Sequence, residues 1–62
     1  MKPNINDVVE LTVPLPDEAF EPGAVGVVVS VFSDPEEAYE VEFANDDGET
    51  IAQLTLLPSQ FK

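Results

Sequence analysis

Alternating hydrophobic and polar positions predict a chain built of short β-strands. The alternation is clearest at residues 38–44, where apolar or aromatic side chains take turns with glutamates. Because successive side chains of a strand point to opposite faces of a sheet, one set is expected to face a core and the other to face solvent. The inward set is Tyr39, Val41 and Phe43, and the outward set is Glu40 and Glu42.

Two more strands are predicted next to this one. Residues 24–32 are rich in valine on both faces, which indicates a strand at the centre of a curled sheet. Gly26 within it is typical of a bulge, a bend or a close backbone approach. Residues 50–56 predict the strand that returns from a hairpin turn at 45–48, with Ala52, Leu54 and Leu56 facing the core. In the valine-rich strand, the residues expected to share one face are Val25, Val27, Val29 and Val31.

The two ends of the chain complete the pattern. Residues 7–13 predict the first strand, whose inward residues are Val9, Leu11 and Val13. A long loop at 14–23 follows, with one helical turn at 16–20 and a type II turn at Pro22-Gly23. Residues 58–61 predict a 3₁₀ turn whose Phe61 could plug an open end of a barrel.

These elements fit a single all-β domain spanning residues 1–62. Four clear strands, a long first loop, tight hairpins and a terminal 3₁₀ turn are typical of a small SH3-like barrel of four to five antiparallel strands, in which closing the sheet protects its edges. A chain this short buries only about 60% of the surface that its unfolded form exposes. Its free energy of unfolding is therefore expected to reach about 3–5 kcal/mol at most.

The charge balance removes most catalytic functions. The chain has 13 Asp and Glu against two Lys, a formal net charge of -11 in 62 residues, and it has no His and no Cys. Without His or Cys there is no ordinary general base near neutral pH, no thiol nucleophile and no zinc site. The two cations are both Lys, so no Arg can clamp a phosphate or carboxylate. We therefore expect no enzymatic activity and no cofactor.

The same charge indicates which partners the protein can approach. An acidic surface repels nucleic acid and anionic membranes, so a basic protein is the expected partner. No apolar run approaches the roughly 20 residues of a membrane helix. The N-terminus lacks the basic and apolar regions of a signal peptide, so a cytoplasmic location is expected, with a monomer or weak homodimer.

Two groups of acidic residues are candidates for a partner-binding surface. An acidic loop that contains an aromatic residue can bind basic or proline-containing peptides, although the preferred interpretation is that the aromatic ring caps the core and the acidic residues are simply exposed. A pair of outward glutamates can act as acid and base in a glycosidase-like site, but only in a deep cleft, so a solubilising or docking surface is preferred. The loop group is Asp17, Glu18, Phe20 and Glu21, and the sheet group is Glu36, Glu37, Glu40 and Glu42.

The predicted hairpin turn carries a third acidic cluster. Asp46, Asp47 and Glu49 flank Gly48, and three carboxylates on one turn could hold Ca²⁺ weakly. Their spacing does not match an EF-hand loop, so a solvated turn is preferred and no metal site is predicted.

The sequence resembles a family of short bacterial proteins catalogued as domain of unknown function 4926. The resemblance covers nearly the whole chain and is most specific in the Tyr-Glu-Val-Glu-Phe block at 39–43. It implies an SH3-like barrel and a partner-binding role such as toxin neutralisation, and it supplies no catalytic residues. Residues 22–28 also resemble the start of a KOW motif, but the RNA-binding KOW families carry basic loops, which this chain lacks.

The leading hypothesis is a non-enzymatic protein-binding module, antitoxin-like or inhibitor-like, that docks a basic partner. One alternative is an acidic mimic of nucleic acid, because carboxylates along a strand can imitate the charge of a duplex, about one per 1.7 Å. Another is a small structural subunit of a larger assembly, joined through an exposed strand edge.

Overall fold

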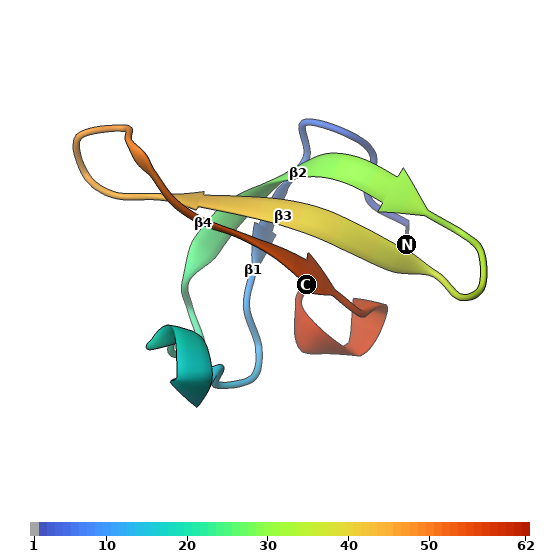
Figure 1. Ribbon diagram of the computed structural model, residues 1–62, viewed down its shortest axis with the longest axis horizontal. Coiled ribbons are helices and arrows are strands. Elements are labelled where there is room, and N and C mark those ends of the chain that lie inside the picture. Colours follow the sequence, from blue (N-terminus) through green and yellow to red (C-terminus); the bar gives the residue numbers. More distant parts are fainter. Residues whose placement is uncertain (1) are drawn as a thin grey trace.

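The computed structural model describes residues 2–62 and shows one antiparallel sheet with the strand order β1-β2-β3-β4 (Figure 1). The predicted all-β class is confirmed, and the four strands form one open sheet. The strands are β1 (Val8–Glu10), β2 (Val25–Phe32), β3 (Ala38–Ala44) and β4 (Thr50–Leu56). Two 3₁₀ turns, η1 (Pro16–Glu18) and η2 (Pro58–Gln60), follow β1 and β4 respectively.

The hairpin of β3 and β4 matches the sequence prediction most closely. Both strands have the predicted bounds, and Tyr39, Val41 and Phe43 are buried. These three residues pair with Leu56, Leu54 and Ala52 respectively, so the predicted inward set of β4 shares their face.

The first strand is shorter than the predicted segment 7–13. It pairs with β2 only as far as Glu10, which lies opposite Val25, the first residue of β2. Beyond that point no residue of β2 is available as a ladder partner. Val9 and Leu11 are nevertheless buried and Val13 packs against the core, so the predicted inward face is confirmed.

The end of the chain lies along the second side of β1. The Glu10 N–H donates to the carbonyl of Lys62 and the Lys62 N–H donates to the carbonyl of Glu10, both at 2.8 Å. Phe61 forms an isolated bridge with Leu11, and its ring meets that of Tyr39 edge-on with centroids 5.3 Å apart. Phe61 is therefore buried in the core of this open sheet, and a single bridge stands where a fifth strand could form.

A bulge in β2 overturns the prediction that its four odd-numbered valines share one face. The register between β2 and β3 shifts just after Val28. Before the shift Val27 pairs with the outward Glu42, whereas after it Val31 pairs with the inward Tyr39. One extra residue in a strand reverses the alternation beyond it, and a run of valines gives no sign of where that occurs.

Gly26 marks a close backbone approach, one of the three predicted possibilities. A Cβ atom there would lie 2.5 Å from Cγ1 of Val41 and 3.0 Å from the carbonyl oxygen of Glu42. Any side chain would push β2 away from β3, so the glycine permits the two strands to pack closely.

Candidate binding groove

The loop between β1 and β2 is anchored at both ends of η1. The Leu15 N–H donates to the carbonyl of Phe20 at 2.9 Å, and the Phe20 N–H donates to the carbonyl of Leu15 at 3.1 Å. Ala19 takes a left-handed φ of 60°, which turns the chain back so that this pair can form. Phe20 then stacks on Phe43, with ring centroids 4.7 Å apart. The loop consequently presents the acidic residues of η1 at a defined place beside the sheet.

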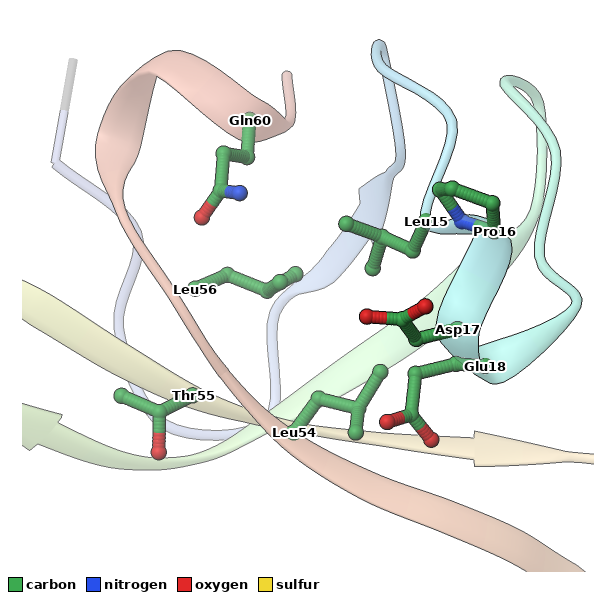
Figure 2. Close-up of a pocket in the computed structure, with 8 residues that line it drawn as sticks. All are labelled: Leu15, Pro16, Asp17, Glu18, Leu54, Thr55, Leu56 and Gln60. Atoms are coloured by element: carbon green, nitrogen blue, oxygen red, sulfur yellow. The ribbon is translucent and has the colours of Figure 1, made fainter.

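The groove lies between η1 on one side and β4 with η2 on the other (Figure 2). Its volume is about 290 Å³. Figure 2 shows the carboxylates of Asp17 and Glu18 pointing from η1 towards β4. The lining residues are Leu15, Pro16, Asp17, Glu18, Leu54, Thr55, Leu56 and Gln60.

The lining combines an apolar floor with a negatively charged wall. Leu15 and Leu54 are half-buried and Leu56 is buried, whereas Asp17 and Glu18 are exposed. No lining residue carries a positive charge. Such a surface can hold an apolar side chain that lies next to a cationic one, because the leucines exclude water while the carboxylates attract the cation.

Two of the predicted glutamates lie on the outward face of β3. Glu40 accepts hydrogen bonds from Oγ1 of Thr55 at 2.7 Å and from Nε2 of Gln53 at 3.2 Å. Glu42 pairs with Gln53 across the ladder. Thr55 belongs to the lining of the groove, but its hydroxyl is bonded to Glu40 on the outward face, so Glu40 lies on the opposite face of β4 from the leucine floor.

Glu37 supports the core rather than the groove. Its carboxylate accepts a hydrogen bond from the hydroxyl of Tyr39, whose side chain is buried as predicted. This hydrogen bond, the burial of Tyr39 and the negative charge of Glu37 all raise the pKa of the tyrosine hydroxyl. Each of them favours the neutral phenol over the phenolate.

The structure brings together only part of the predicted partner-binding set. Asp17 and Glu18 line the groove, whereas Glu21 and Glu36 are exposed outside it. Phe20 faces the core, where it holds η1 in place.

The groove also contains residues that the sequence prediction gave no binding role: it assigned Leu54 and Leu56 to the core and Gln60 to the 3₁₀ turn. Leu54 and Leu56 form its floor, and Gln60 borders it with Oε1 accepting the N–H of Leu57 at 2.7 Å. One signal in the sequence points to them: residues 50–57 carry no charge in a chain that is 24% charged.

A second hollow of about 520 Å³ lies between the N-terminal segment and η2. None of the predicted partner-binding residues lines it. Its lining contains one acidic residue, Asp7, and one basic residue, Lys62, so it lacks the acidic excess of the groove. Its lining residues are Pro3, Asp7, Val8, Val9, Pro58, Phe61 and Lys62.

The acidic hairpin turn is organised by an asparagine. Oδ1 of Asn45 accepts the backbone N–H groups of Asp47 and Glu49, both at 3.0 Å. Within residues 2–62, no cluster of three or more ligating side chains is placed to hold a metal ion. The same part of the chain contains no helix with the length and apolar character needed to cross a membrane.

The family comparison covers almost the whole fold. The model described as domain of unknown function (DUF4926) matches residues 5–62, which include every strand, both 3₁₀ turns and all the groove residues. No curated protein and no solved structure matches the chain significantly. The family match confirms the resemblance seen in the sequence, and the chain belongs to the DUF4926 family.

Proposed function

We propose that this protein is a non-enzymatic binding module whose groove takes a positively charged segment of a protein partner. The observation that carries the proposal is the meeting of two carboxylates, Asp17 and Glu18, with the leucine floor of β4. The net charge of -11 adds a long-range attraction that speeds association with cationic proteins. A basic toxin or enzyme that is blocked by this contact is the class of partner we propose.

The groove is expected to bind a single short segment weakly. Exposed ion pairs contribute about 0.2–1 kcal/mol each, so burial of an apolar side chain on the leucine floor must supply most of the affinity. A dissociation constant of roughly 10 μM to 1 mM follows for an isolated peptide. A folded partner would add contacts outside the groove.

The test uses a capped heptapeptide, Lys-Lys-Val-Lys-Lys-Val-Lys, which as a strand carries both lysine and valine on each face. It is titrated into the protein at about 0.15 M salt, where charges more than about 8 Å apart are largely screened. Binding is followed by NMR chemical shifts. The double variant Asp17→Asn/Glu18→Gln removes the acidic wall and should weaken binding about two- to thirtyfold, the equivalent of two exposed ion pairs.

The matched control is Asp46→Asn/Asp47→Asn, which removes the same charge from the hairpin turn, outside the groove lining. It should change the dissociation constant less than the groove variant does. Equal losses in both variants would indicate diffuse attraction, as a nucleic-acid mimic requires, and would contradict the proposal. Absence of peptide binding at millimolar concentration would also contradict it.

A further inference from the structure

The edge strand β4 has a free side. It pairs only with β3 and lies at the end of the strand order (Figure 1). Within residues 2–62, no backbone hydrogen bond joins Thr50–Leu56 to any segment other than β3. In an antiparallel pair, alternate residues direct their N–H and C=O groups away from the neighbour. β4 therefore presents a row of unpaired donors and acceptors.

The usual protection of such an edge is missing from most of β4. Natural proteins blunt exposed edges with charged side chains, proline or bulges. Residues 50–57 read Thr-Ile-Ala-Gln-Leu-Thr-Leu-Leu, without a charge, proline or glycine, and Ile51 is 55% exposed. The one register shift in this pair lies at its hairpin end, where Ile51 is an extra residue of β4 between the pairs Phe43–Ala52 and Ala44–Thr50. Most of β4 is thus open to a further strand.

The surroundings of the edge determine what that strand must carry. Leu54 and Leu56 line the groove, so a strand added beside β4 would lie next to the carboxylates of η1. On the other face Glu40 is bound to Thr55 of the same edge. A second copy of this chain would bring another charge of -11 and would be repelled, whereas a cationic strand meets carboxylates on both of its faces.

We infer that the partner contributes an extended basic segment that adds to β4 as a new strand, with its backbone bonded to the free edge. This inference rests on the proposed function and specifies how the groove is used. Backbone hydrogen bonds would supply affinity, and alternate side chains would reach Asp17 and Glu18 on one face and Glu40 on the other.

The experiment compares the heptapeptide described above with an analogue that is N-methylated at its five internal residues. The analogue keeps the side chains and the charge but cannot donate backbone hydrogen bonds along its length. Amide hydrogen exchange of the protein is measured by NMR with each peptide. We expect the parent peptide to slow exchange at alternate residues of β4 by about tenfold, since a bonded amide must open before it exchanges. The analogue should bind more weakly and leave these amides unprotected.

Each other outcome contradicts the inference. If both peptides bind equally and Asp17→Asn/Glu18→Gln weakens both, the groove binds basic segments without strand addition, and only the proposed function stands. If neither peptide binds, the proposed function fails as well. A further outcome is that, in the peptide-free protein, protection of the β4 amides increases with protein concentration while light scattering shows a dimer at low salt. In that case a second copy of the chain occupies the edge.

Discussion

The two edges of the sheet differ in whether a neighbouring segment covers them. At β1 the end of the chain supplies a neighbour, with three backbone hydrogen bonds between Glu10–Thr12 and Gln60–Lys62 of 2.8–2.9 Å. At β4 no described segment supplies one. The first edge is also covered by the buried ring of Phe61, whereas the second carries the half-exposed Ile51.

The covered edge contributes to the stability of the fold, whereas the free edge remains available to bind another molecule. A domain of 62 residues has a small hydrophobic core. The covered edge enlarges this core by the ring of Phe61, which packs next to Tyr39. The free edge adds little to that core, and its backbone groups remain open to another molecule. We therefore expect substitutions at the β1 edge to affect folding and changes near the β4 edge to affect binding.

The largest expected effect comes from Phe61→Ala. Loss of a buried phenylalanine costs about 3–5 kcal/mol, which equals the whole expected stability of a domain this size. We expect the variant to be largely unfolded at 25 °C by circular dichroism and urea titration. The control is Ile51→Ala on β4, which should cost less than about 0.5 kcal/mol because the side chain is mostly exposed. Similar losses in both variants would contradict the distinction between the edges.

A smaller loss is expected from Gly26→Ala, between the two edges. The new methyl group would meet Cγ1 of Val41 at 2.5 Å and the backbone of Glu42 at 3.0 Å. Overpacking of this kind costs about 1–3 kcal/mol. Urea titration measures the change, and Val25→Ala on the neighbouring exposed position should cost less than about 1 kcal/mol. A neutral Gly26→Ala variant would show that β2 and β3 can separate without penalty.

How far the sequence predicts this fold depends on whether the deciding contact is local. The alternation at 38–44 and 50–56 predicts β3 and β4 with the observed bounds, because a hairpin pairs residues that are close along the chain. The length of β1 is set by where β2 begins opposite it, since Glu10 pairs with Val25, and this contact between distant residues is contained in no local pattern. The bulge after Val28 is hidden for another reason: valine suits either face of a strand.

The groove is predictable only on its acidic side. Asp17 and Glu18 are identified from the composition of the loop, because acidic residues beside an aromatic anchor are visible in the sequence. Leu54 and Leu56 have the inward positions of an ordinary core pair. Whether an inward leucine lies under other atoms or beside a groove depends on where η1 crosses the sheet, and Phe20 decides that through its stacking on Phe43.

Alkaline pH is expected to destabilise the core next to the covered edge. Because the pKa of Tyr39 is raised in the folded state above its ordinary value of 10.0, the unfolded chain releases the proton first as the pH rises. The stabilisation from this tyrosine is fully present below pH 10 and is lost as the pH rises through the folded pKa. Thermal midpoints should therefore fall more steeply above pH 10 than those of Tyr39→Phe.

This chain allows a direct check on the same group. It contains one Tyr and no Trp, so tyrosinate absorbance near 295 nm reports Tyr39 alone. The midpoint of this absorbance change should lie at a higher pH in the folded protein than in the urea-unfolded protein. Glu37→Gln keeps an acceptor for the hydroxyl but removes the charge, and it should lower the titration midpoint. Coincident titration of the folded and unfolded protein would contradict the proposed environment of Tyr39.

The smallest effect is expected from salt, and it can distinguish the two edges residue by residue. With a net charge of -11 the folded chain repels itself, and the repulsion weakens as the screening length falls from about 30 Å at 0.01 M salt to a few Å near 0.5 M. The midpoint should rise by several degrees, about 4–8 °C for each 1 kcal/mol gained. The amides of Glu10, Thr12 and Lys62 are bonded at the covered edge, so their exchange requires opening and should slow as salt stabilises the fold. The β4 amides that point away from β3 have no backbone partner, so they exchange without opening of the fold. Their exchange should not slow to the same extent. If both sets slow equally, the β4 edge is already covered in solution and cannot receive a partner strand.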